Sequence, residues 1–133
     1  MKLALAQINP LVGDLKGNAE TISSICEIAT KKGANLLLTP ELSLWGFPPK
    51  DLLLNSHLIA TQNNILDELS KQIYYHSPNI KVLVGIAEPT QDLLLPNLFN
   101  SIALIKNSEW NVIARKQLLP TYDVFDEKRY FRP

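Results

Sequence analysis

The feature that most constrains the fold is an alternation of short apolar runs with longer segments of helical periodicity. Apolar runs at residues 2–8, 36–38 and 80–87 predict strands, and helical spacing over about 18–32 and 58–74 predicts helices between them. This order is typical of a largely parallel sheet with helical crossovers, so the predicted fold class is α/β. The first run is apolar on both alternating faces, which predicts a central strand.

The first helix is predicted to begin at about Asn18, whose side chain can cap the first turn, and to end at Lys32 with Gly33 as the stop. The single cysteine, Cys26, lies on its apolar stripe with Ile22, Ile25 and Ala29. Cys26 is therefore interpreted as a small buried hydrophobe rather than as a nucleophile or metal ligand. One cysteine cannot form an internal disulfide, which agrees with a reducing cytoplasm.

The pattern changes after residue 88. An irregular loop over 88–98 precedes two predicted strands, 99–106 and 110–117, joined by a turn at 107–109. On the second of these strands, one predicted face carries Trp110, Val112, Ala114 and Lys116. Lys116 is then either a strand-end residue with its ammonium group in water or a site residue held by a carboxylate.

Glu41 is the candidate general base. It follows the apolar run at 36–38, and Pro40 prevents that strand from continuing. Ligand sites collect at the carboxyl ends of strands in open α/β sheets, and Phe47 and two prolines stiffen the loop that follows. The alternative interpretation is an ordinary solvated loop residue, because most carboxylates are exposed.

The segment 122–131 interleaves aromatic and charged residues. It is either a surface loop with a 3₁₀ turn and local ion pairs or a substrate-contacting loop that supplies a phenol and a second carboxylate. The last residues, Arg132 and Pro133, follow this extended loop, which leads us to expect a fragment of a larger α/β domain.

Several classes of function are disfavoured. Thirteen basic and thirteen acidic side chains cancel without a basic run, so neither nucleic acid nor a membrane surface is the expected partner. The chain contains no GxGxxG, P-loop or GxSxG motif. His57 and His76 stand alone, so no metal site is predicted, and both are interpreted as helix-surface residues.

Four groups of residues together resemble a known family: Gln7–Asp14 with Gly17 and Asn18, Thr39–Leu42 with Gly46–Leu53, Asn100 and Ser101 with Ala103, and Arg115–Pro120 with Tyr122 and Val124–Phe131. They are similar to the amino-terminal glutaminase domain of glutamine-dependent NAD⁺ synthetases, in the nitrilase or carbon-nitrogen hydrolase superfamily. The resemblance covers essentially all 133 residues. It implies a nitrilase-like α-β-β-α sandwich of which residues 1–133 form about the first half, without the synthetase domain.

The resemblance also implies roles for individual residues. In this family a glutamate takes the thiol proton of a cysteine, the cysteine attacks the carboxamide of glutamine, and a lysine stabilises the oxyanion. Glu41 matches the base and Lys116 the lysine, as catalytic residues. Tyr122 matches a residue of the glutamine pocket, and Glu127 resembles a second, supporting glutamate that orients the lysine.

The chain departs from the family where the nucleophile would be. The family cysteine lies in an Ile-Cys-Glu-Asp-x-Trp segment, which is absent here, and Cys26 does not match it. Phe47, Thr121 and Asp123 stand where Tyr, Asn and Gly are common, so a different pocket lip is expected. We therefore expect the catalytic cysteine to be missing and the fragment to be inactive by itself.

For the parent protein, the resemblance implies glutamine hydrolysis that supplies ammonia for ATP-dependent amidation of nicotinic acid adenine dinucleotide. ATP and Mg²⁺ belong to the absent synthetase domain, and no cofactor is expected in this chain. A cytoplasmic homo-oligomer is the expected form. Two alternatives stay open: a stand-alone amidase of the same superfamily, and a non-catalytic module that keeps the fold.

Overall fold

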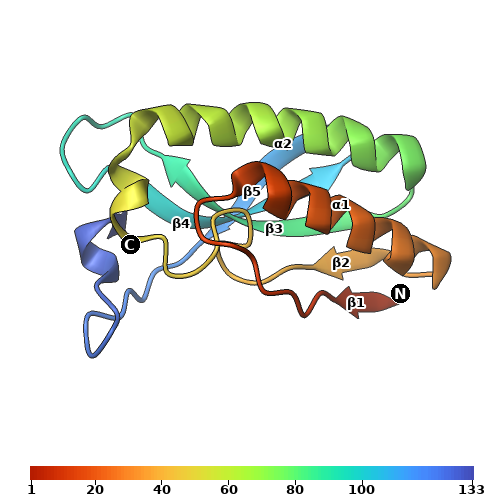
Figure 1. Cartoon of the computed structure of the whole chain (residues 1–133), viewed down its shortest axis with the longest axis horizontal. Coiled ribbons are helices and arrows are strands. Elements are labelled where there is room, and N and C mark those ends of the chain that lie inside the picture. The colour runs from red at the N-terminus through yellow and green to blue at the C-terminus, as the bar shows by residue number, and fades with distance from the viewer.

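A six-stranded sheet and two long helices form the framework of the computed structural model, which describes all 133 residues (Figure 1). The elements in chain order are β1 (Leu3–Leu5), α1 (Leu15–Lys31), β2 (Leu36–Leu38), the 3₁₀ helix η1 (Lys50–Leu54), α2 (Ser56–His76), β3 (Lys81–Pro89), β4 (Leu98–Lys106), β5 (Glu109–Arg115), the 3₁₀ helix η2 (Glu127–Arg129) and β6 (Phe131–Arg132). The predicted alternation of strands and helices up to β3 is confirmed.

The sheet has the order β1-β2-β3-β4-β5, and β6 pairs with β4. β1, β2 and β3 are parallel, whereas β4 and β5 continue as antiparallel strands. The prediction of a central first strand is wrong, because β1 pairs only with β2 and so forms an edge. Leu3 and Leu5 are exposed, and only Ala6, just after the strand, is buried.

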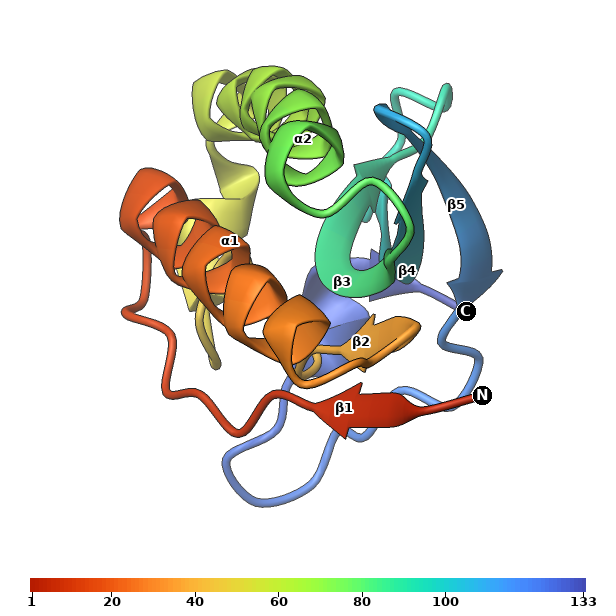
Figure 2. The ribbon, with the colours of Figure 1, turned by 90° about the vertical axis from the view of Figure 1, so that its right-hand side faces the viewer.

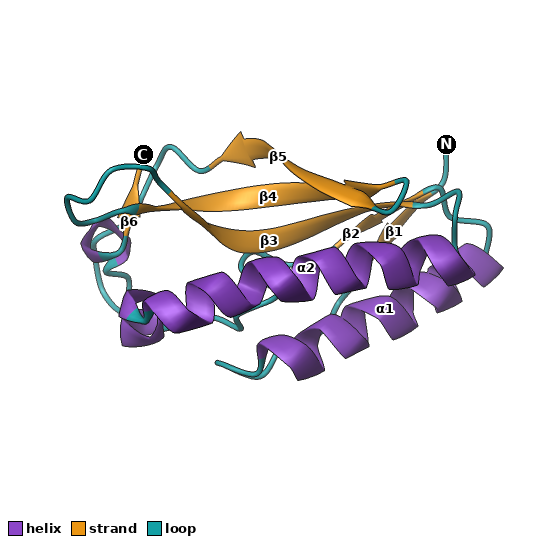
Figure 3. Cartoon of the chain, turned by 90° about the horizontal axis from the view of Figure 1, so that it is seen from above, coloured by secondary structure: helices purple, strands orange, loops and turns teal.

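Both helices cover the same face of the sheet (Figures 2 and 3). The core lies between this helical layer and the strands, and its fully buried side chains include Ile22, Leu37, Trp45, Leu66, Ile86 and Ile105. The opposite face carries no helix and leaves apolar side chains such as Ile102 exposed. Neither helix combines the length and the apolar character needed to cross a membrane.

Helix α1 begins three residues before the predicted position. Asp14 is its N-cap, and the Asp14 side chain accepts a hydrogen bond of 3.0 Å from the backbone N–H of Gly17. Asn18 is instead buried inside the first turn, where its side-chain amide donates to the carbonyls of Leu11 and Leu44. The helix ends at Lys31, and Gly33 follows with a positive φ of 80°, as the sequence predicts.

Helix α2 carries two polar residues with contacts that the sequence pattern does not reveal. Gln62 interrupts the apolar face of this helix and is fully buried: its Oε1 accepts from Trp45 Nε1 at 2.7 Å, and its amide donates to the carbonyl of Ala87 at 2.7 Å. His57 is exposed as predicted, but His76 is not a simple surface residue. Its ring nitrogens lie within hydrogen-bond distance of the hydroxyls of Ser23 and Ser77, because the end of α2 packs against α1.

The β4–β5 hairpin turns on two residues rather than three. Asn107 and Ser108 both have positive φ, as a tight hairpin turn requires, and Glu109 already pairs with Lys106. A β-bulge then interrupts β5, because Ala103 pairs with Val112 but its neighbour Ile102 pairs with Ala114.

The bulge corrects the predicted face of Lys116. Paired residues share a face and successive residues alternate, so Val112 and Ala114 lie on opposite faces, with Ile113 as the extra residue. Trp110 lies on the helical side, where its Nε1 donates to Asp67 of α2 at 2.8 Å. Lys116, whose backbone N–H bonds to Asn100, therefore lies on the uncovered side of the sheet.

Candidate active site

Glu41 is held by a loop that lies directly on β3. β2 ends at Leu38, and the following turn approaches Gly85 so closely that a Cβ on Gly85 would lie 2.3 Å from the backbone nitrogen of Leu42. The Ser43 hydroxyl accepts the N–H of Gly85 at 3.2 Å, and the N–H of Leu44 donates to the Gly85 carbonyl at 3.2 Å. These contacts place Glu41 at the carboxyl end of β2, as the sequence predicts.

Lys116 meets two carboxylates. Its Nζ donates to Oε1 of Glu41 at 2.8 Å and to Oε1 of Glu127 at 3.1 Å. Partial burial alone would lower the pKa of Lys116, but the hydrogen bonds and charges of Glu41 and Glu127 outweigh it, so the pKa is raised. Lys116 is therefore a fixed cation at neutral pH, which decides between the two interpretations of its position.

Glu127 is more deeply buried than Glu41 and Lys116. It begins η2, is only 6% exposed, and its backbone N–H donates to the carbonyl of Pro120 at 3.1 Å. Its Oε1 holds Lys116, while its buried Oε2 has no hydrogen-bond partner in the protein.

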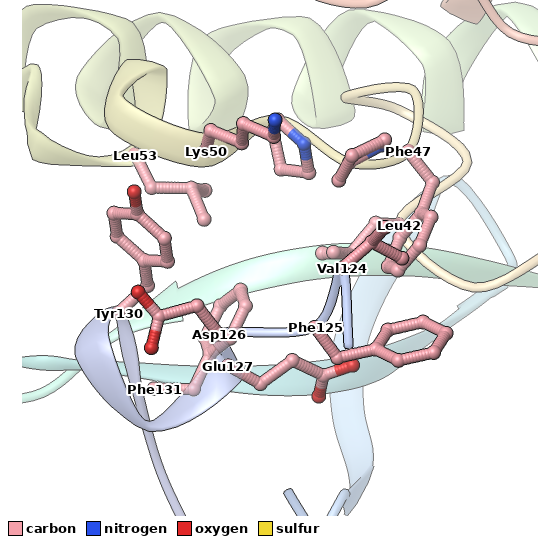
Figure 4. Close-up of a pocket in the computed structure, with 12 residues that line it drawn as sticks. Leu42, Phe47, Lys50, Leu53, Val124, Phe125, Asp126, Glu127, Tyr130 and Phe131 are labelled. Atoms are coloured by element: carbon pink, nitrogen blue, oxygen red, sulfur yellow. The ribbon is translucent and has the colours of Figure 1, made fainter. Parts of the chain in front are cut away.

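A cavity of about 220 Å³ lies beside Glu127, between the segment that follows Glu41 and the segment 124–131. Figure 4 shows Phe47, Lys50 and Leu53 on one side of it and Val124, Phe125 and Glu127 on the other. Most of its lining is apolar. Of Glu41, Lys116 and Glu127, only Glu127 lines this cavity.

Glu41 and Lys116 line a second cavity, of about 400 Å³, on the face of the sheet that the helices leave uncovered. Its lining includes Glu41, Gly85, Asn100 and Lys116. The Glu41 side chain is 43% exposed and the Lys116 side chain 31%. A small molecule can therefore reach the Glu41 carboxylate and the Lys116 ammonium group, whereas Glu127 contacts Lys116 from the buried side.

Tyr122 lies at the rim rather than within this group. It is 71% exposed and packs edge-on against Phe125, with ring centroids 5.7 Å apart; Phe125 in turn contacts Phe47. Tyr122 and Lys116 line one open cavity together. The structure thus brings Glu41, Lys116 and Glu127 into direct contact and leaves Tyr122 beside them.

Cys26 lies in the core on α1 and is not part of either cavity. Burial raises the pKa of its thiol to about 11, although hydrogen bonds from Ser77 and Thr30 act in the opposite direction. The predicted burial of Cys26 is confirmed. No group of three or more His, Cys, Asp or Glu side chains is placed to hold a metal ion.

Two residues of the site were missed as functional by sequence reasoning. Asn100 donates from Nδ2 to Oε1 of Glu41 at 2.6 Å, and Gly85 makes room for the Glu41 loop. The glycine inside an apolar strand was the available signal, because it often marks a close backbone approach. Asn100 is one of the residues that carry the family resemblance, but the resemblance implies no function for it.

Comparison with known proteins decides the family. The sequence model of the carbon-nitrogen hydrolase family matches residues 2–133. The chain belongs to the carbon-nitrogen hydrolase family. The family match thus covers both Glu41 and Lys116.

Among characterised relatives, the chain is 44% identical over 132 residues to the glutamine-dependent NAD⁺ synthetase of Synechocystis sp., covering 97% of this chain and 23% of that protein. The solved structure of the glutamine-dependent NAD⁺ synthetase from Acinetobacter baumannii, in complex with ADP, superimposes with a TM-score of 0.81 at 34% identity, over 98% of this chain and 23% of that one. An amidase from Nesterenkonia sp. gives a TM-score of 0.76 at 25% identity, over 100% of this chain and 48% of that one.

The chain covers only part of the length of each of these relatives. It spans about a quarter of the length of the synthetase relatives and about half of the amidase. The mixed α/β fold therefore corresponds to part of the full-length fold of this carbon-nitrogen hydrolase family, as predicted.

Proposed function

We propose that residues 1–133 supply the general base and the oxyanion cation of a glutamine amidohydrolase centre in a longer glutamine-dependent NAD⁺ synthetase. The observation that carries the proposal is the convergence of Glu41, Lys116 and Glu127, from three separate segments, at an open cavity of a carbon-nitrogen hydrolase chain. The names of the relatives support glutamine as the substrate.

The two groups suit the two halves of amide hydrolysis. Glu41 is a partly exposed carboxylate that can take the proton of an attacking thiol. Lys116 is a fixed cation that can stabilise the negative charge on the oxygen of the tetrahedral intermediate. Glu127 holds the ammonium group from the buried side, so the cation keeps its place as charge develops.

The nucleophile of this reaction is a cysteine outside residues 1–133. Cys26 is in the core with a raised pKa, and the chain offers no second thiol. ATP and Mg²⁺ would act in a synthetase part that is also outside these residues, where the ammonia would be consumed. The structure of the Acinetobacter relative is a complex with ADP, which supports nucleotide use by a longer synthetase.

A stand-alone amidase is the second candidate, because the Nesterenkonia amidase matches all of this chain with a TM-score of 0.76. Both candidates use the same base and cation. They differ in the fate of the ammonia: a synthetase consumes it with ATP and nicotinic acid adenine dinucleotide, whereas an amidase releases it. A non-catalytic module would do neither.

The test compares the longer natural protein with the 133-residue chain. We expect the longer protein to convert glutamine to glutamate, with a thioester on one cysteine detectable by mass spectrometry, and to form NAD⁺ when ATP and nicotinic acid adenine dinucleotide are added. The 133-residue chain should release no ammonia. Cysteine-dependent turnover by that chain would show that the nucleophile has been misplaced, and ammonia release without NAD⁺ would favour the amidase.

A further inference from the structure

We propose that Asn100 is a positioning residue of the hydrolase centre, which occupies Oε1 of Glu41 and thereby makes Oε2 the oxygen that receives the thiol proton. The inference rests on the proposed function.

Asn100 is built into the framework rather than into a loop. It lies on β4, pairs with Ala87 of β3 and is 4% exposed. From this position its Nδ2 donates to Oε1 of Glu41 at 2.6 Å. A buried amide on a central strand has little rotational freedom, so the carboxylate that it contacts is oriented by the sheet.

The two oxygens of Glu41 have different surroundings. Oε1 receives both the Asn100 amide at 2.6 Å and the Lys116 ammonium group at 2.8 Å. Oε2 makes no hydrogen bond to the protein. Two donors concentrate negative charge on Oε1 and block the approach of a proton to it, so Oε2 is the free acceptor.

The same residue also sets the position of Lys116. The backbone carbonyl of Asn100 accepts the N–H of Lys116 at 2.8 Å, just after the last residue of β5. The side chain of Asn100 therefore holds the base and its main chain holds the cation. The distance between the two functional groups is fixed through one residue.

The proton transfer is balanced within this arrangement. The S–H bond of the external cysteine breaks as an O–H bond forms at Oε2 of Glu41, and the sulfur electron pair bonds to the carboxamide carbon. The electrons of the C=O bond move to the oxygen near Lys116. When the tetrahedral intermediate collapses, the C–N bond breaks and the proton on Oε2 passes to the leaving nitrogen as ammonia departs.

An asparagine suits this task better than the residues of similar shape. A leucine would fill the same volume without a donor, and Oε1 would then keep only the hydrogen bond from Lys116. An aspartate would place a second negative charge against Glu41 near neutral pH and could donate only after protonation. These differences define the variants for the test.

The kinetic test uses the longer natural protein with Asn100→Leu, Asn100→Asp and the control Ser101→Ala. Ser101 is the neighbouring buried residue on β4. Its side chain lies on the face of β4 opposite to that of Asn100, and its hydroxyl donates to Glu88 of β3. We expect Asn100→Leu to lower kcat for glutamine hydrolysis by about 10–100-fold with KM nearly unchanged, because only proton transfer is affected. Asn100→Asp should recover activity as the pH falls and the introduced carboxyl group becomes a donor, and Ser101→Ala should keep a kcat near that of the wild type.

A second measurement does not depend on the proposed function. In the 133-residue chain, NMR can follow the exchange of the Lys116 ammonium protons with water. We expect Asn100→Leu to accelerate this exchange severalfold, because Glu41 loses its fixed orientation, and Ser101→Ala to leave it unchanged. Unchanged exchange, or a kcat within twofold of wild type for Asn100→Leu, would overturn the role of Asn100; absence of glutaminase activity in the wild-type longer protein would instead overturn the proposed function.

Discussion

Nζ of Lys116 lies 2.8 Å from Oε1 of Glu41, although the two residues are 75 positions apart in the chain. Two local irregularities produce this contact. Gly85 lets the Glu41 loop lie on β3, and the extra residue Ile113 reverses the alternation of β5, so that the Lys116 side chain points to the uncovered face of the sheet.

Gly85→Ala should displace the Glu41 loop. The new Cβ would lie 2.3 Å from the nitrogen of Leu42, which forces the backbone to shift, and we expect a loss of about 1–3 kcal/mol in the free energy of unfolding. Urea unfolding measures this loss, and NMR of the Lys116 ammonium group reports whether Glu41 has moved.

Gly33→Ala is the matched control for that variant. Gly33 also has a positive φ, so alanine costs about 1–2 kcal/mol there, but no atom lies within 4 Å of the new Cβ. Stability should fall while the Glu41–Lys116 contact persists. An undisturbed contact in Gly85→Ala as well would contradict the role given to Gly85.

Gln62→Leu should destabilise the chain, although it makes the buried face of α2 more apolar. The substitution leaves Trp45 Nε1 and the backbone N–H and carbonyl of Ala87 buried without partners, which costs at least about 2 kcal/mol. Urea unfolding followed by tryptophan fluorescence checks this expectation. Gln72→Leu, at an exposed position of α2, should change stability by less than about 0.5 kcal/mol.

Glu88→Gln should alter the acid sensitivity of the fold. Hydrogen bonds from Arg115 hold the pKa of Glu88 below its usual range, although partial burial opposes them and Ser101 adds a further hydrogen bond. A lowered native pKa contributes stability above the unfolded value of about 4.5, and this stability is lost as the pH falls through the native value.

The wild type should therefore be more stable than Glu88→Gln near neutral pH, and the difference should shrink between about pH 5 and pH 3. Denaturant midpoints across this range give the comparison. Glu68→Gln removes the same charge from an exposed position of α2 that makes no ion pair, and serves as the control. A difference that grows on acidification would show that Arg115 does not stabilise the Glu88 carboxylate.

Cys26 should react with thiol reagents only when the fold opens. Its side chain is fully buried and burial raises its pKa to about 11, so the thiolate is scarce and inaccessible. Near neutral pH we expect slow labelling of the native chain and fast labelling in denaturant, measured by absorbance of the released thiol chromophore. Equally fast labelling in both states would mean that α1 does not bury this residue.

The parts of the structure that sequence reasoning predicted correctly rest on local signals. Pro40 ends β2 and so locates Glu41, and the helical spacing around Cys26 indicates its burial. Helix α1 was misplaced at its start because both Asp14 and Asn18 are good capping residues, and only tertiary contacts show that Asn18 is needed inside the turn.

The errors arose where pairing partners, rather than local pattern, decide the outcome. An unbroken alternation over residues 110–116 conceals the bulge, because the extra residue is defined by its opposite strand. Gln62 looked like an interruption of an apolar face because its partners, Trp45 and Ala87, lie on other elements. The position of β1 at the edge depends likewise on strand order, which a single apolar run does not specify.

The most direct test of the proposed hydrolase centre is glutamine-dependent ammonia release by the proposed longer protein carrying Glu41→Gln or Lys116→Met. Each change should lower kcat by at least about 100-fold, because one removes the proposed base and the other the proposed oxyanion cation. Glu68→Gln should retain activity. Ammonia release within twofold of wild type in either site variant would contradict the assignment of Glu41 and Lys116 as the hydrolase centre.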